Sequence, residues 1–308
     1  MKKRPSIAYA AIILCAGVLR LDPVFAQDLE PRRWTPLPVG TNVVGAGYVH
    51  TTGDIFFDPV LNVEDTTVEV DTAILSAVHS FSLAGKLARF DAIIPWQTAR
   101  WEGLLNGEPA SVERTGFADP IFRLSMNLLG APNAGAAELR RYMAEHPVNT
   151  MVGAAVAVTV PLGKYYDNKL LNLGENRFTI RPQIGVVHSR GPWSYELTGS
   201  IFFYTDNNDF YNGKKREQDP LYALQAHLVR LIKPGLWASL SAGYTRGGRS
   251  TINGVAKNDE NTNILSAFSV GVPVTRTQGI KATYLRARTQ EDTGGDTDSL
   301  MLGWSVMY

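Results

Sequence analysis

Apolar and polar residues alternate along most of this chain with a period of two. In the segment "FRLSMNL", residues 122–128, every second side chain is large and apolar, and the residues between are polar. The segment "WSYELTGSIFFY", residues 193–204, continues the same alternation. Successive side chains of a strand point to opposite faces, so this pattern predicts strands with one apolar face and one polar face.

The same period recurs often enough to place twelve strands. The longest apolar stretch, "MVGAAVAVTVPLG" at 151–163, is rich in valine and ends in Pro-Leu-Gly, which also favours a strand. The predicted strands lie at 40–52, 66–80, 86–96, 117–129, 150–161, 177–189, 193–205, 219–231, 236–247, 261–273, 279–289 and 299–308.

The connections between these strands alternate in length. Links such as "SLAGK", "RGPW" and "IKPGL" are short, whereas "TQEDTGGDTDS" and "GGRSTINGVAKNDENT" are long and polar. Short turns on one side and long loops on the other are typical of a transmembrane β-barrel. Closure pairs every strand edge, which lipid requires. The pattern therefore predicts an all-β protein, a transmembrane antiparallel up-and-down β-barrel of twelve strands.

One long link falls on the side of the short turns. It contains helix-forming residues at 137–145, followed by Pro147 as a stop, and predicts a short periplasmic helix. The alternative to a membrane barrel is a soluble exported β-sandwich, which also has many short strands. That alternative explains the alternation but leaves the asymmetry of the loops unexplained.

The beginning of the chain predicts export. Lys2, Lys3 and Arg4 precede an apolar run at 7–19, and small residues at "VFAQ" follow, as in a signal peptide over 1–26. A short periplasmic segment over 27–39 and a barrel domain over 40–308 are expected after it. The only cysteine lies within the signal, so the rest of the chain offers no disulfide or thiolate site. Acidic residues slightly outnumber basic ones there, which argues against nucleic acid as a partner.

The chain ends in a strand whose last residue is aromatic. Trp304, Val306 and Tyr308 share one face, and Tyr308 falls at the periplasmic interface, where an aromatic belt is expected. We interpret these residues as a signal for the outer-membrane assembly machinery.

Four longer blocks resemble one family. They are "PVGTNVVGAGYVHTTGDIFFDPVLNVED", "GFADPIFRLSMNLLGAP", "VPLGKYYDNKLLNLGENRF" and "TDNNDFYNGKKREQDPLYALQAHLVR". They look like the blocks of the outer-membrane transporter family labelled MetA-pathway of phenol degradation, over about 34–308. Phe178 stands where many relatives have tryptophan. The resemblance implies an outer-membrane barrel associated, in some relatives, with degradation of aromatic compounds.

Polar faces turned away from lipid would line the lumen. They form either a charged path for a solute or ion pairs that fill and stiffen the barrel. Twelve strands are intermediate between a filled barrel and an open channel, which predicts a narrow or gated lumen. The residues assigned inward by parity are Glu69, Asp71, Arg89, Asp91, Arg123, Arg181, Glu196, Gln225 and His227.

Other candidate sites carry less chemistry. Asn172, Asn176 and Arg177 would brace a loop or contact a ligand. The acidic loop at 291–298 lacks the spacing of a calcium loop, so no metal is expected. His79 and His188 each precede a serine, but neighbouring strand residues face opposite ways, so we expect no esterase and no cofactor.

The sequence therefore predicts a protein of the cell outer membrane, in contact with lipid, that passes small solutes, hydrophobic or aromatic ones included, by passive diffusion. A structural or ligand-binding barrel with a plugged lumen is the alternative.

Overall fold

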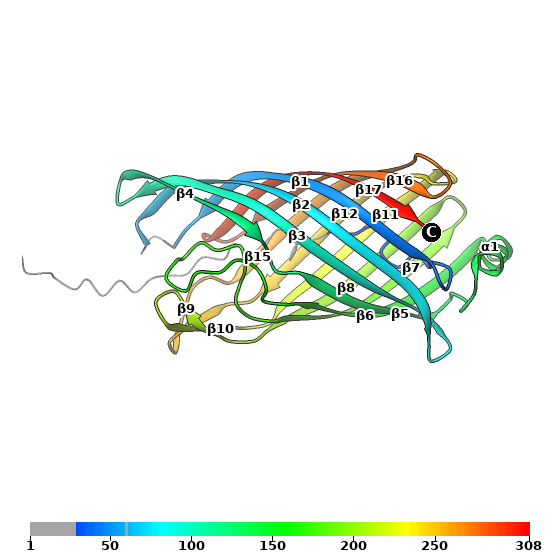
Figure 1. Ribbon diagram of the computed structural model, residues 1–308, viewed down its shortest axis with the longest axis horizontal. Helices are drawn as coiled ribbons and strands as arrows, with labels where there is room; N and C mark the ends of the chain where they lie inside the picture. Colours follow the sequence, from blue (N-terminus) through cyan, green and yellow to red (C-terminus); the bar gives the residue numbers. More distant parts are fainter. Residues whose placement is uncertain (1–28, 59–60) are drawn as a thin grey trace, which may run out of the picture.

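The computed structural model describes residues 29–58 and 61–308, and the signal peptide predicted over 1–26 lies outside them. Within the described chain one large antiparallel sheet closes on itself (Figure 1). Its strands are β1 (Asn42–Phe56), β2 (Val63–Leu83), β3 (Lys86–Leu105), β4 (Glu108–Phe117), β5 (Ile121–Leu129), β6 (Val148–Thr159), β7 (Thr179–Arg190), β8 (Trp193–Tyr204), β11 (Leu221–Lys233), β12 (Leu236–Gly247), β15 (Asn261–Pro273), β16 (Gln278–Thr289) and β17 (Gly294–Met307).

Closure comes from three pairings at the start of the chain. β1 pairs with β17 on one side and with β2 on the other, and β2 pairs with β3, which completes the ring through β5. β4 pairs only with the outer part of β3 and is not part of the ring. The predicted twelve-stranded antiparallel barrel is confirmed.

The two ends of the barrel differ. The short-turn end holds the tight turns at 84–85, 191–192 and 234–235, the C-terminus and the helix α1 (Ala136–Glu145) (Figure 1). This helix confirms the one predicted over 137–145. The long-loop end holds β4 and a small second sheet of β9 (Asn207–Phe210), β10 (Lys214–Gln218), β13 (Ser250–Ile252) and β14 (Val255–Ala256). These short strands were not predicted, because they lie within loops.

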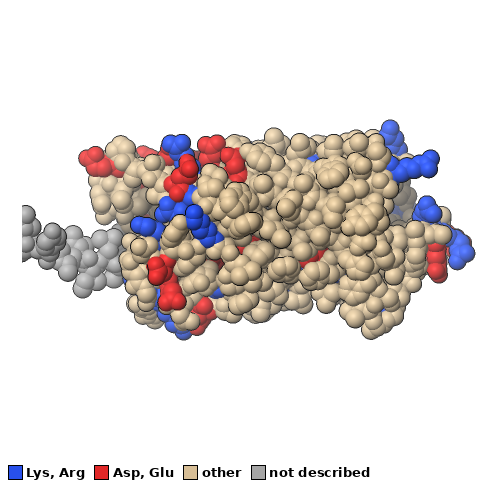
Figure 2. Space-filling view, viewed as in Figure 1, with Lys and Arg blue, Asp and Glu red and all other residues tan. Residues whose placement is uncertain are grey.

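The outer surface of the barrel carries the apolar faces of the strands. Leu75, Leu240 and Leu300 point outward and are 60–64% exposed. Charged side chains gather at the two ends, and the band between them is almost free of them (Figure 2). Such a surface is costly in water, at about 25 cal/mol per Å² of apolar area, and favourable in lipid. This excludes the soluble β-sandwich. No described helix is long and apolar enough to cross a membrane.

β2 and β3 are longer than a membrane requires. They have 21 and 20 residues, whereas about 9–11 residues of a tilted strand span the hydrocarbon. Their outer parts, together with β4, therefore extend past the lipid at the long-loop end. In this outer part of β2 the inward face is the apolar one. Val68 and Val70 on that face pack with Trp101 and Leu173 in an apolar cluster.

Candidate functional site

A cluster of charges lies inside the barrel, where β3 and β5 pair. Asp91 stands opposite Arg123 in register, and Arg123 Nε donates to Asp91 Oδ2 at 3.1 Å. Arg89 Nε lies 3.2 Å from the other carboxylate oxygen. Glu30 and Arg33 complete the cluster, with Arg123 Nη1 donating to Glu30 Oε2 at 2.8 Å and Arg33 Nη2 at 3.3 Å from Asp91. Arg89, Asp91 and Arg123 thus face the lumen, as parity predicts, and are held by ion pairs.

Residues 29–38 run through the lumen, and the prediction of a segment on the periplasmic side over 27–39 is wrong for them. Leu29 is buried against Leu265 and Ala267, deep within the barrel. At the other end of the segment, the backbone N–H of Val39 bonds the carbonyl of Ala134 at the short-turn end. Nothing in the residue pattern indicates this path, because the ion-pair partners of the segment lie on distant strands.

Trp34 fixes the middle of this lumen segment. Its indole Nε1 donates to Thr198 Oγ1 at 2.8 Å, and its ring covers Gly153 and Gly185. A Cβ added to Gly185 would lie 1.9 Å from the indole nitrogen, so a glycine is required there. β6 and β7 therefore provide a slot for the ring, which holds the segment against the wall.

Glu69 and Asp71 are not in the lumen, and their inward assignment is wrong. Asp71 stands opposite His50 on the outer face, where its Oδ1 lies 2.8 Å from His50 Nδ1 and also accepts a hydrogen bond from Tyr48. The cause is a change in the polarity of the two faces along β2: past the lipid the inward face is apolar, as at Val68 and Val70, and the outward face is polar. His50, Glu69 and Asp71 come close enough to share a cation, but they are exposed, and Asp71 already has two partners.

The remaining inward assignments agree with the geometry. Glu196 Oε2 accepts the backbone N–H of Arg32 at 2.8 Å, and the guanidinium of Arg181 lies 5.0 Å above the ring of Phe202. Gln225 lies two residues before His227 on the same side of β11. These residues bind the lumen segment or the wall, as the ion-pair interpretation expects.

His227 makes a contact that sequence reasoning missed. Its Nδ1 lies 2.8 Å from Ser241 Oγ on β12, which register places directly opposite. The other ring nitrogen, Nε2, has no hydrogen-bond partner among the described residues. A serine–histidine pair therefore exists without the third group that would orient the imidazole.

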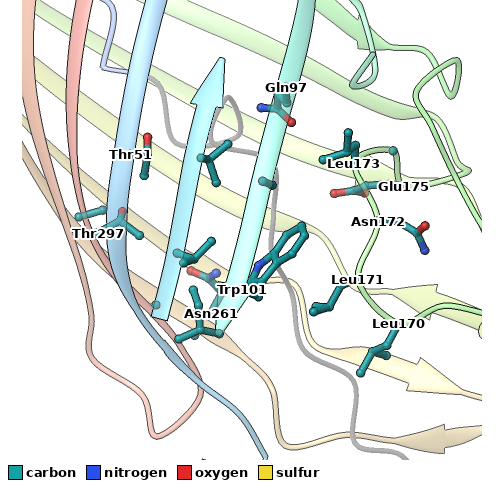
Figure 3. A pocket seen from close by; sticks show the side chains of 18 of the residues that line it. Thr51, Gln97, Trp101, Leu170, Leu171, Asn172, Leu173, Glu175, Asn261 and Thr297 are labelled. Carbon is teal, nitrogen blue, oxygen red and sulfur yellow. The ribbon is translucent and has the colours of Figure 1, made fainter. Parts of the chain in front are cut away.

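The loop at 165–175 folds into the long-loop end. Asn172 braces it, because its side chain accepts the N–H of Tyr166 at 2.8 Å and donates to the carbonyls of Tyr166 and Lys169. Asn176 Nδ2 donates to Asn207 Oδ1 at 3.0 Å, and Arg177 Nη2 lies 2.6 Å from Glu175 Oε2. All three predicted residues therefore hold loop structure, and Asn172 also borders the cavity at this end (Figure 3).

Asp119 anchors this loop at its base. Its two carboxylate oxygens accept the backbone N–H groups of Gly163 and Glu175, each at 2.8 Å. Burial raises the pKa of Asp119 to about 6, although the two backbone bonds oppose the rise. The residue lies between β4 and β5, outside the spanning strands, and sequence reasoning did not single it out.

Cavities lie at both ends of the lumen. One of about 150 Å³ lies at the long-loop end and is lined by Trp101, Leu171 and Asn172, which Figure 3 shows around it. The other, about 570 Å³, lies at the short-turn end. Leu285 and Ser299 line both, so the cavities adjoin at these residues. Leu29 and Glu30 of the lumen segment border the larger cavity.

The C-terminal residues lie at the short-turn end. Trp304 faces outward, and the backbone of Tyr308 exchanges two hydrogen bonds with Asn42, each 2.9 Å, so the last residue still belongs to the closing seam. Their role as an assembly signal stays a prediction. Two carboxylates of the acidic loop, those of Asp296 and Asp298, pair with Arg288.

Comparison with known proteins adds a family and a fold. A family model described as "Putative MetA-pathway of phenol degradation" matches residues 42–298. An outer membrane channel from Pseudomonas putida F1 has a similar structure, with 23% identity, a TM-score of 0.74 and coverage of 91% of this chain and 100% of that one. The β domain of the Bordetella autotransporter BrkA gives 8% identity, a TM-score of 0.47 and coverage of 87% and 100%. No curated protein matches the chain.

Proposed function

Because this chain belongs to the family described for the MetA pathway of phenol degradation, we propose that it is an outer-membrane channel for small molecules, hydrophobic or aromatic ones included. Movement is by passive diffusion, inward down a concentration gradient. The observation that carries the proposal is the pair of adjoining cavities, which reach from the long-loop end to the short-turn end beside the lumen segment. The short-turn end then faces the periplasm.

Leu285 is the residue at which the route can be tested. It faces the lumen and borders both cavities, whereas Leu240 faces outward and is 62% exposed. We expect Leu285→Trp to fill the junction and lower both conductance in planar bilayers and flux of phenol into liposomes. Leu240→Trp, the matched control, should change neither. Absence of conductance and flux in the unmodified protein would overturn the proposal.

A plugged barrel is the second candidate, and the lumen segment favours it. Ion pairs and a tryptophan slot hold residues 29–38 in the lumen, as a plug requires. If the segment is a permanent plug, the complete protein conducts nothing, and a variant lacking residues 29–38 conducts strongly. A channel with a narrow route conducts in both forms, and more in the truncated one.

We propose no catalytic step for this protein. The two histidines with adjacent serines bond elsewhere, since His79 Nδ1 lies 2.8 Å from Asn42 Oδ1 and His188 Nδ1 lies 2.9 Å from Thr150 Oγ1. Incubation with p-nitrophenyl esters tests this, and turnover lost in Ser241→Ala would contradict it.

A further inference from the structure

The larger cavity exists because the barrel wall has glycines where side chains would otherwise fill it. These glycines occupy inward positions on four strands that are neighbours in the sheet: β1, β17, β16 and β15. A Cβ added at Gly47 or Gly303 would meet nothing closer than 3.5 Å, so the space in front of them is free. The glycines that border the cavity from inward positions are Gly45, Gly47, Gly271, Gly279 and Gly303.

Lys281 is the cation within this hollow. It lies on β16, directly opposite Gly303 on β17 and Gly271 on β15. Gly303 has no side chain to cover its stem, and the indole of Trp237 lies over Gly271. It borders the cavity and makes no ion pair with any residue of 29–58 or 61–308. The carboxylate of Glu30, which borders the same cavity, is already bound by Arg123 at 2.8 Å and Arg33 at 3.4 Å.

The rest of the wall is largely apolar. Val49, Ile74 and Ile93 line one side of the cavity, and Trp237 and Met301 line others. A cavity with apolar walls and one lysine ammonium is poorly solvated by water alone. It suits a ligand that has both an apolar body and a negative charge. The volume of about 570 Å³ is within the range of small-molecule sites.

The electrostatic surroundings have the same sign. Among the described charged side chains around the lumen segment and this cavity, guanidinium and ammonium groups outnumber carboxylates, which favours anions. The cations are Arg32, Arg33, Arg89, Arg123, Arg181 and Lys281, and the carboxylates are Glu30, Asp91 and Glu196.

We propose that this cavity is a binding site for a small carboxylate with an apolar body. The carboxylate contacts Lys281 Nζ, and the body packs on Val49, Ile74 and Trp237. The inference rests on the proposed function, since it names the class of solute that pauses in the channel. Arg276, which borders the cavity in the turn at the short-turn end, adds a second cation on the way out.

Calorimetry on the purified protein in detergent tests this, with benzoate as the probe and benzyl alcohol as its neutral counterpart. We expect benzoate to bind more tightly, and Lys281→Met to weaken benzoate at least about tenfold while leaving benzyl alcohol unchanged. Lys281→Arg should restore binding. Lys86→Met, at an exposed turn of the same end, is the matched control and should have no effect.

Gly303→Phe tests the contribution of the cavity volume to binding separately from that of the Lys281 charge. It fills free space, so heat-modifiable gel mobility should stay normal while both probes lose affinity. Equal affinity for the two probes, or benzoate binding unaffected by Lys281→Met, would overturn the inference. Because binding is measured without a membrane, lost flux with intact benzoate binding would instead count against the proposed function alone.

Discussion

Asp91 is the residue on which the interior charges converge. Arg33, Arg89 and Arg123 all lie within 3.3 Å of its carboxylate, and Arg123 also reaches Glu30. Each of these groups is tolerable at membrane depth only because the others compensate it. Arg123 is central, since it joins the barrel wall to the lumen segment.

Arg123→Ala should therefore release the segment. Removing one partner of a buried ion pair costs about 3–5 kcal/mol, so we expect lower thermal stability and, because Glu30 loses its anchor, higher single-channel conductance. Arg230→Ala is the control, since Arg230 is exposed and lies 5.0 Å above the ring of Trp193. An unchanged conductance with reduced stability would show that the segment does not limit the path.

Asp119 gives the inward loop a dependence on pH. Its pKa is about 6 in the folded protein, above the ordinary value near 3.8, so the folded state binds a proton between about pH 4 and 6 that the unfolded state lacks. Docking of the loop should then be firmer at pH 5 than at pH 7.

Limited trypsin digestion at Lys164 and Lys169 measures this docking. We expect slower cleavage at pH 5 than at pH 7, relative to Asp119→Asn at the same pH, because the amide does not titrate. If the ratio between the two proteins is the same at both pH values, the assignment of the pH effect to Asp119 is wrong.

The alternation in the sequence predicted the strands well, but it predicted which side faces the lumen well only within the lipid. Arg89 and Asp91 were placed correctly because Phe90 and Ile94 between and beyond them face lipid. On β2 the same rule failed for Glu69, because above the lipid the outer face is wet and the inner face is apolar. The inward position of Lys281 could have been predicted by the same alternation, since Ile280 and Tyr284 mark the outer face of its strand. The path of the lumen segment could not be predicted, because the residues it contacts are distant in the sequence.

The slot between β6 and β7 yields a prediction about one element. Gly185→Ala should push Trp34 away from Thr198, at a cost of about 1–3 kcal/mol in the free energy of unfolding, with a change in tryptophan fluorescence. Gly199→Ala on β8, where an added Cβ meets nothing within 4 Å, should leave both signals as they are. Equal behaviour of the two variants would contradict the slot.

Closure of the barrel depends on pairing between its first strand and its last one. β1 and β17 pair over their full length, and Tyr308 bonds Asn42 at the end of that seam. The last residue is thus both part of the closing contact and exposed at the short-turn end.

Deletion of Tyr308 should lower the amount of assembled, heat-modifiable barrel in membrane fractions, because the seam loses its last bonds and the terminal aromatic that we interpret as an assembly signal. Replacement by Phe keeps the aromatic ring and the backbone bonds, so it should assemble normally. Full assembly without Tyr308 would count against that interpretation.

The change in polarity along the outer face of β2 also marks where the strand leaves the hydrocarbon. On the outer face Leu75 is apolar, whereas Asp71 and Glu69 are charged, so the boundary between hydrocarbon and water crosses the strand near Ala73. From there to Val63 the strand rises about 3.3 Å per residue at a tilt near 45°, which carries the rim roughly 23 Å outward. The mouth of the barrel therefore stands well clear of the hydrocarbon, and its wall there is in contact with the polar layer of the membrane.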